Sequence, residues 1–228
     1  MLTERAKDGQ PDVCWSRASD PSRSVCSRYY ERHETVIGLG EMSHFAPTGR
    51  YVGETLSGVP HGNGLFTVTD LSAPVFYLFS FVKDPAEPDL DSQLQAGRAL
   101  VLDGQWTNGA FTGAGRVIMP QGGTLEGNFQ NAILVKGEAR SITRRAIGLM
   151  FSWAGGRYTG SIIDGRIANG KITSRTTDRE NRDWTLVEEG SFEEEHVVTG
   201  DRTLMEGSVV VWIETCRRGE CSQTYRRR

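Results

Sequence analysis

The chain has 228 residues and a formal net charge of −3 at pH 7, with 27 glycines, 8 prolines and 37% hydrophobic residues. A chain with this charge lacks the strongly basic face on which general nucleic-acid binding depends, so we expect no nucleic-acid partner. Glycine is well above its usual ~7% of residues while proline is ordinary, which favours a turn-rich β protein. The sequence has no run of 18 apolar residues and no recognisable signal peptide, so it predicts no membrane span.

The N-terminal segment, residues 1–45, mixes aromatic residues such as Trp15 and Tyr29 with serines, arginines and acidic residues. Repeat arrays need atypical ends to cover their exposed apolar face. We therefore expect this segment to fold as a cap onto the repeat that follows it.

A four-glycine pattern occurs twice after this segment. The first copy holds Gly53, Gly58, Gly62 and Gly64, and the second, 51 residues later, holds Gly104, Gly109, Gly113 and Gly115. Such a repeat indicates a stack of supersecondary units, each packed only on its neighbours. The sequence therefore predicts one elongated array over residues 46–213.

Weaker copies follow at Gly127, Gly160 and Gly190. After Gly127 and Gly160 the next glycine of the pattern comes ten residues later, at Gly137 and Gly170, where the first two copies have nine. We expect β-bulges or longer turns to absorb this extra residue.

Two stretches interrupt the array. Residues 76–81 are expected to form a copy that has lost its glycines, with the acidic residues 84–91 as an insertion. Residues 141–153 have some helical character and are expected to form a loop or a short helix on the flank.

Each copy is predicted to form an antiparallel β-hairpin. Side chains alternate along a strand, so the residues two before and two after the leading glycine share its face. These residues are Tyr51 and Thr55, Leu102 and Trp106, Leu125 and Phe129, and Tyr158 and Ile162. A glycine between bulky neighbours usually leaves room for a ring or for adjacent backbone. The pairs Ser57-Gly58, Asn108-Gly109 and Asp164-Gly165 suit tight turns that need positive φ.

This pattern resembles the MORN (membrane occupation and recognition nexus) repeat, which opens with aromatic-x-Gly and closes with a His-Gly-x-Gly-like element. The closest matches are YVGETLSGVPHGNG from Tyr51 and LDGQWTNGAFTGAG from Leu102, and the resemblance extends over roughly residues 49–207. The chain departs from the pattern where Leu102 and Leu125 replace the aromatic residue, Ala132 replaces a turn glycine, and Glu188 opens the fifth copy. The resemblance implies an adaptor or scaffold, in some cases tied to membranes.

The C-terminal part, residues 214–228, follows the apolar run Val209–Ile213, which we expect to be a closing strand. It is rich in arginine, and the candidates for contact with anionic lipid are Arg217, Arg218, Arg226, Arg227 and Arg228. The alternative is a solvated terminus.

The four cysteines lie near the two ends of the chain. A turn at residues 217–220 would bring Cys216 and Cys221 opposite one another, and Cys14 and Cys26 are the other local pair. Two disulfides on the caps would place the protein in an oxidising compartment. Free thiols, and a metal site despite unsuitable spacing, are the alternatives.

No catalytic or phosphate-binding motif is recognisable, so we expect no cofactor and no metal. The pair Gly38 and Gly40 lacks the rest of a dinucleotide motif, and Pro85 and Pro88 argue against a calcium loop in the acidic stretch. What remains is surface, because a stripe of Tyr51, Trp106, Phe129 and Tyr158 along the array would suit a protein partner. The alternative is that these residues form its packing layer.

The sequence therefore predicts an all-β, elongated antiparallel hairpin array that is capped at both ends. We expect it to be a non-enzymatic interaction or structural protein in the periplasm or outside the cell. A membrane-surface binder that uses the arginine-rich tail and an enzyme with a site between distant loops are the alternatives.

Overall fold

The computed structural model describes residues 9–17, 19–30, 48–70, 99–119, 122–143, 156–177, 180–193 and 196–226. These residues form fourteen β-strands and no helix, so the predicted all-β hairpin array is confirmed. The chain divides into two compact units with a boundary after Leu134, at the start of β8.

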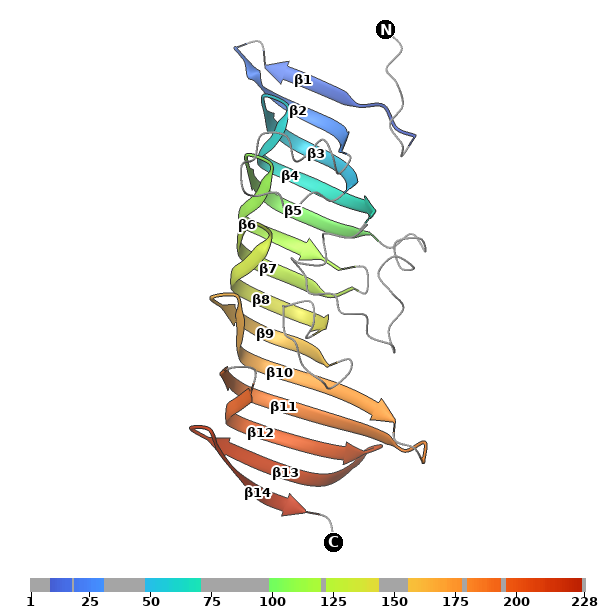
Figure 1. The fold of residues 1–228 in the computed structure, drawn as a ribbon, viewed down its shortest axis with the longest axis vertical. Helices are drawn as coiled ribbons and strands as arrows, with labels where there is room; N and C mark the ends of the chain where they lie inside the picture. Colours follow the sequence, from blue (N-terminus) through green and yellow to red (C-terminus); the bar gives the residue numbers. More distant parts are fainter. Residues whose placement is uncertain are drawn as a thin grey trace. The chain divides into compact units, whose positions relative to one another are not determined.

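The strands of the first unit are β1 (Val13–Arg17), β2 (Asp20–Tyr30), β3 (Thr48–Leu56), β4 (Val59–Asp70), β5 (Leu100–Thr107), β6 (Ala110–Ile118) and β7 (Thr124–Gln130). Each pairs with the next in chain order, always antiparallel. Figure 1 shows this order as strands lying side by side.

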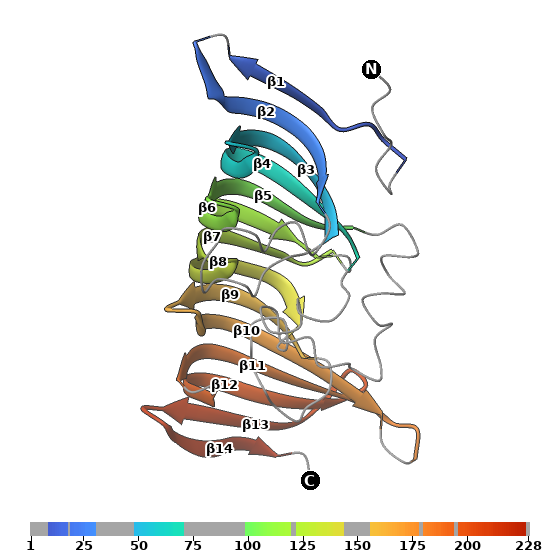
Figure 2. The ribbon, with the colours of Figure 1, turned by 45° about the horizontal axis from the view of Figure 1, so that its top comes forward.

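The strands of the second unit are β8 (Ile133–Thr143), β9 (Arg157–Ile163), β10 (Arg166–Thr177), β11 (Asp183–Glu193), β12 (His196–Glu206), β13 (Val209–Arg217) and β14 (Glu220–Arg226). They too pair antiparallel in chain order. In Figure 2 the strands of each unit are curved ribbons rather than flat ones.

A single row of cross-strand partners, the glycine ladder, runs through each unit. In the first unit it consists of Cys26, Gly53, Gly64, Gly104, Gly115 and Gly127. In the second it consists of Ala139, Gly160, Gly170, Gly190, Gly200 and Cys216. The terminal cysteine of each ladder then faces its disulfide partner, Cys14 in β1 and Cys221 in β14.

Ladder glycines such as Gly53 and Gly160 have no space for a side chain. A Cβ added to Gly53 would lie 2.6 Å from the carbonyl oxygen of Asn63 and 2.7 Å from the hydroxyl oxygen of Tyr51. A Cβ added to Gly160 would lie 2.5 Å from the hydroxyl oxygen of Tyr158. Both a ring and adjacent backbone therefore fill the space, as the large-glycine-large pattern predicted.

The predicted hairpin turns are confirmed. Ser57 and Gly58 have φ values of 52° and 80°, and Asn108 and Gly109 have 49° and 83°, the two successive positive values of a type I′ turn. Asp164 and Gly165 repeat this pattern with 50° and 72°.

Adjacent turns are also linked by backbone hydrogen bonds. Gly109 N donates to Pro60 O (2.9 Å), and Ala132 N donates to Phe111 O (2.8 Å). In the second unit Gly165 N donates to Val135 O (3.0 Å). Each of these three hairpins is therefore fixed at its turn, as well as along its strands, to the strand that precedes it.

The predicted equivalence of the later glycines is wrong by two residues. Gly170 faces Gly160 as Gly64 faces Gly53, so Gly170 corresponds to Gly64 and not to Gly62. Gly62 instead has a φ of 81° and lies where the β3–β4 register shifts. The hairpin of Gly53 and Gly64 thus contains the larger bulge. The hairpin of Gly160 and Gly170 has one residue fewer between its two ladder glycines, where the sequence analysis expected one more.

In the copy that starts at Gly127, the ladder position of β8 is Ala139, because this residue faces Gly160. Gly137 faces Ile162 instead, so its assignment to the glycine pattern is wrong.

The face that carries the glycine ladder, which we call the inner face, holds the apolar core. The eight residues predicted to flank the leading glycines are all buried, with at most 3% of their surface exposed: Tyr51, Thr55, Leu102, Trp106, Leu125, Phe129, Tyr158 and Ile162. The sequence pattern therefore identified the core face correctly.

At the two ends, β2 pairs with β3 along residues 23–30, and the expected closing strand is part of β13. Residues 141–143 belong to β8, and the rest of the expected helical stretch lies outside the described residues. The expected copy at 76–81, the acidic insertion at 84–91, and Gly38 and Gly40 also lie outside them.

Candidate interaction surfaces

The aromatic stripe of the sequence analysis lies in the packing layer of the two units. Tyr51 and Trp106 meet edge to face with ring centroids 5.5 Å apart, and Trp106 and Phe111 are 5.2 Å apart. Phe129 continues the row at 4.8 Å from Phe111, and in the second unit Tyr158 meets an aromatic neighbour in the same way. These rings stabilise the core.

The two buried tyrosines make equivalent hydrogen bonds. The hydroxyl of Tyr51 donates to the carbonyl of Glu54 (2.7 Å), and that of Tyr158 donates to the carbonyl of Ser161 (2.7 Å). In each case the acceptor lies three residues further along, just past the ladder glycine. Burial raises the pKa of Tyr158 from 10.0 to about 12, and burial, followed by nearby Tyr30 and Glu54, raises the pKa of Tyr51 well above its usual range.

The opposite face of the first unit, the outer face, carries exposed apolar side chains. Trp15 faces Val25 across β1 and β2, and their exposed fractions are 62% and 44%. Val52 faces Leu65 across β3 and β4, with exposed fractions of 47% and 36%. Because Val25 faces Glu54, two residues from Val52, the two pairs are diagonal neighbours. We call these four residues the outer apolar strip.

Carboxylates accompany the outer apolar strip. Glu54 lies opposite Val25, and its Oε2 accepts a hydrogen bond from the backbone N of Asn63 (2.8 Å). Asp103 lies opposite Leu65 and is exposed. A binder on this strip would therefore meet aliphatic surface and negative charge together.

A small polar cleft lies beside Val25 on the first unit. Its volume is about 60 Å³, and Ser24, Thr55 and His61 contribute to its lining. The Ser24 and Thr55 hydroxyls are hydrogen-bonded to one another at 2.8 Å, and among the described residues the buried Nδ1 of His61 has no hydrogen-bond partner. A cleft of this size has room for a few water molecules but not for a substrate.

In the second unit the inner face changes from apolar to charged. The row of cross-strand partners runs from Tyr158 and Ile172 to Glu188, Arg202 and Glu214. Arg202 Nε lies 3.1 Å from Glu188 Oε1, and Arg202 Nη1 lies 2.8 Å from Glu214 Oε2. The side chain of Glu188 is only 8% exposed, and the guanidinium of Arg202 satisfies both carboxylates.

A hollow of about 460 Å³ lies beside this ion-pair triad, and Glu188, Glu193, His196 and Arg202 contribute to its lining. Both signs of charge are present, and the triad residues bind one another. The hollow therefore lacks the convergence of one kind of group that would define a ligand class.

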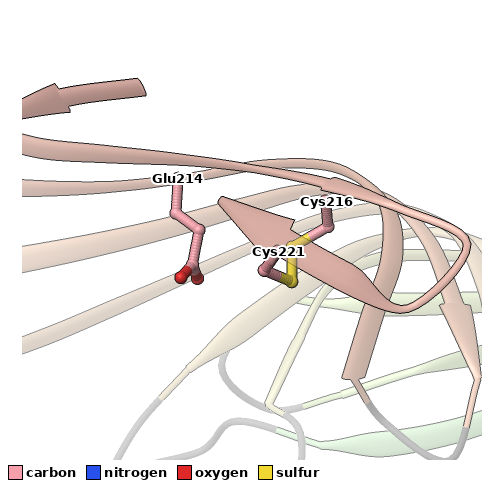
Figure 3. A group of neighbouring side chains, drawn as sticks. All are labelled: Glu214, Cys216 and Cys221. Atoms are coloured by element: carbon pink, nitrogen blue, oxygen red, sulfur yellow. A yellow bond between two sulfur atoms is a disulfide. The ribbon is translucent and has the colours of Figure 1, made fainter. Parts of the chain in front are cut away.

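The cysteine pairs are joined as the local pairing predicted, Cys14 with Cys26 and Cys216 with Cys221. Figure 3 shows Glu214 projecting on the same side of the sheet as the second pair. The three side chains lie within 4.8 Å of one another, a grouping that resembles a metal site. Because the two sulfurs are bonded to each other and Glu214 is ion-paired, the group offers no thiolate ligand.

The arginines of the C-terminal part are divided between a turn and its flanks. Arg217 ends β13, Arg218 begins the turn with a φ of 54°, and both are exposed. Arg226 ends β14, so the chain up to this residue is a strand and not a frayed end, and Arg227 and Arg228 lie outside the described residues. In the described part of the chain no helix has the length and apolar character needed to cross a bilayer.

The sequence analysis missed the outer apolar strip and the ion-pair triad. Val52 and Leu65 directly adjoin ladder glycines, so strand alternation alone places them on the outer face. Glu188 was noted as a departure from the pattern, and Arg202 and Glu214 stand two residues from Gly200 and Cys216 in the same way. Charged residues two positions from a ladder residue, where the other hairpins have apolar ones, were the sequence signal that could have predicted the ion-pair triad.

Comparison with known proteins finds no protein-family model that matches the chain and no match among curated proteins.

Proposed function

We propose that the protein is a non-enzymatic interaction module of the MORN type, and that its partner binds the outer apolar strip of the first unit. The observation that carries the proposal is the cross-strand pair Val52 and Leu65, two aliphatic side chains exposed by 47% and 36% on a regular sheet face. Contiguous exposed apolar groups on a soluble sheet commonly mark interaction sites.

The charges beside the strip define the chemistry of the partner. Glu54 lies two residues from Val52 in β3, and Asp103 in β5 lies opposite Leu65. A partner that offers aliphatic or aromatic side chains next to lysine or arginine would bury the apolar atoms and keep the carboxylates paired at the rim. We therefore expect a protein segment with alternating apolar and basic residues.

The cysteines bear on the compartment. The two disulfide pairs fit an oxidising compartment outside the cytosol. We propose the periplasm or the extracellular space, with the protein acting as an adaptor or structural component there.

A peptide selection tests the binding proposal. A phage-displayed library of random 12-residue peptides is selected on the immobilised full chain, and the selected peptides are titrated against variants. We expect peptides with apolar residues next to lysine or arginine, and at least a tenfold loss of affinity for the double variant Val52→Ser/Leu65→Ser. A tenfold loss corresponds to about 1.4 kcal/mol, a reasonable value for two partly buried aliphatic side chains.

The matched control is Ile163→Ser, which removes an equally exposed aliphatic side chain (47%) from the second unit. This variant should bind the selected peptides as the unchanged protein does. Failure to enrich any peptide, or equal binding to the Val52→Ser/Leu65→Ser variant, would contradict the proposal.

A second double variant tests the contribution of the two carboxylates to peptide binding. Glu54→Gln/Asp103→Asn should reduce the preference for basic peptides and weaken the dependence of binding on salt, because it removes the carboxylates without removing the apolar strip. Unchanged salt dependence would show that the partner chemistry is misassigned.

A further inference from the structure

The edge strand β1 has its unpaired backbone groups arranged symmetrically about Trp15. Among the described strands, β1 pairs only with β2. The Cα atoms of Cys14 and Cys26 are 4.1 Å apart, the short spacing of a non-hydrogen-bonded antiparallel pair. The N–H and C=O groups of Cys14, and by alternation those of Ser16, therefore point away from β2 toward the open edge.

We propose that two copies of the chain associate through this edge, β1 against β1 and antiparallel, with a two-fold axis at Trp15. In this register Cys14 of one copy faces Ser16 of the other. These are the residues whose backbone groups point outward, so the two pairs can exchange four hydrogen bonds. The surface is self-complementary, as a two-fold interface requires.

The side chains support this register. Trp15 would face Trp15 of the second copy as a non-hydrogen-bonded pair, in which cross-strand side chains lie closest. Both rings lie on the outer face, where each already faces Val25, so association would form one continuous apolar row of four side chains. A tryptophan that is 62% exposed at the centre of an edge strand would become largely covered.

The other end of the chain has a different character. In β14 the residues Ser222, Gln223 and Thr224 are polar and exposed, as is common for the terminal strand of a repeat array, and they lie beside one exposed aromatic residue, Tyr225. Polar terminal strands discourage pairing between sheets, whereas β1 has valine and tryptophan on its outer face. This asymmetry favours association through β1 with β1 over a head-to-tail chain of β14 on β1.

The interface is small, because β1 has five residues. It falls below the usual size of stable dimer interfaces, so we expect a dissociation constant in the micromolar range or weaker. Trp15 and Val25 also belong to the outer apolar strip, but the dimer rests on the open edge of β1 and the peptide site on the Val52–Leu65 pair, so variants of β1 and of that pair test the two proposals separately.

Sedimentation velocity of the full chain, from about 1 to 500 μM, is the first test of this association. We expect reversible dimers with no larger species. Trp15→Ser and Ser16→Pro should each raise the dissociation constant of the dimer at least tenfold. Ser16→Pro removes an N–H that points away from β2, so the β1–β2 pairing should survive.

Tyr225→Ser is the matched control, because it removes a similarly exposed aromatic side chain (46%) from the other terminal strand and should leave the dimer unchanged. Circular dichroism of each variant checks that the strands are retained. A monomer at every concentration, or a dimer indifferent to Ser16→Pro, would overturn the proposal.

Photo-crosslinking fixes the geometry. With benzoylphenylalanine in place of Trp15, crosslinks between copies should map to residues 13–17 by mass spectrometry. Crosslinks to residues 220–226 would instead show head-to-tail pairing and refute the two-fold arrangement.

Discussion

The ring of Tyr51 lies directly over Gly64, its neighbour across the β3–β4 hairpin, so that a Cβ on Gly64 would collide with the Cε2, Cζ and Oη atoms of the ring. The same relationship recurs between Tyr158 and Gly170, where the Cβ would lie 2.8 Å from Cε2. Ring and glycine thus form a repeated packing unit.

Gly64→Ala should lower the free energy of unfolding by about 2 to 3 kcal/mol, the usual penalty for overpacking a rigid site. Urea unfolding measures the loss. In a double-mutant cycle with Tyr51→Ala, much of the cost of Gly64→Ala should disappear, because the ring that causes the collision is gone.

Gly207→Ala is the control for backbone strain without crowding. Gly207 has a φ of 57° and no neighbouring heavy atom within 4 Å of an added Cβ, so its cost should be about 1 kcal/mol. Equal costs at Gly64 and Gly207 would show that ring packing is not the reason for the ladder glycine.

Alkaline pH should destabilise the protein through its buried tyrosines. The pKa of Tyr158 is about 12 in the folded chain against 10.0 ordinarily, so the unfolded chain releases this proton first. The stabilisation is complete below pH 10 and is lost as pH rises from 10 to 12. Tyr51, whose pKa is raised in the same direction, adds to the effect.

Urea midpoints between pH 8 and 11.5 test this dependence. Tyr158→Phe should flatten it and should cost about 1 to 2 kcal/mol at neutral pH, because the Ser161 and Asn169 carbonyls lose a donor. Tyr225→Phe, at a tyrosine that is 46% exposed, should leave the free energy of unfolding at neutral pH nearly unchanged.

Loss of the cation should lower the free energy of unfolding more in the ion-pair triad than in an exposed surface ion pair. Arg202→Met leaves two neighbouring carboxylates without their cation, one of them on a side chain only 8% exposed, and should cost about 2 kcal/mol. Lys171→Met breaks the pair with Glu189, whose side chains are 51% and 64% exposed, and should cost less than about 1 kcal/mol. Comparable losses in urea unfolding would contradict this ranking.

The disulfides should act locally. Cys216→Ser/Cys221→Ser removes a crosslink worth about 2 kcal/mol by loop entropy. Hydrogen exchange should therefore accelerate in β13 and β14 while β5 and β6 keep their protection, since units of a repeat array contact only their neighbours. Acceleration spread evenly over every strand would show that the terminal hairpin is coupled to the whole.

Local chemistry made most of the fold predictable from sequence. Turn pairs such as Asn108-Gly109 need positive φ, and alternation about Gly104 places Leu102 and Trp106 on one buried face. The pairing register between strands was harder to predict, because both Gly62 and Gly64 fit the glycine spacing. Only the bulge in β4 decides which of the two faces Gly53 in the ladder. A bulge changes the count by one residue and leaves little trace in composition.

The surfaces were less predictable than the core. The aromatic residues stand out in the sequence, yet the same pattern describes a groove and a packing layer, and burial places Tyr51 and Trp106 in the latter. The outer apolar strip depends on exposure of Val52 and Leu65 across two strands, which requires the pairing to be known.

The glycine ladder also determines how the length of this protein can change. Gly64 faces Gly104, and Gly115 faces Gly127, so loss of the β5–β6 hairpin would bring Gly127 opposite Gly64 with every remaining side chain still on its original face. Gain or loss of a whole hairpin therefore preserves both crosslinked ends. Evolution can lengthen or shorten such a protein in steps of one hairpin without redesigning its interior.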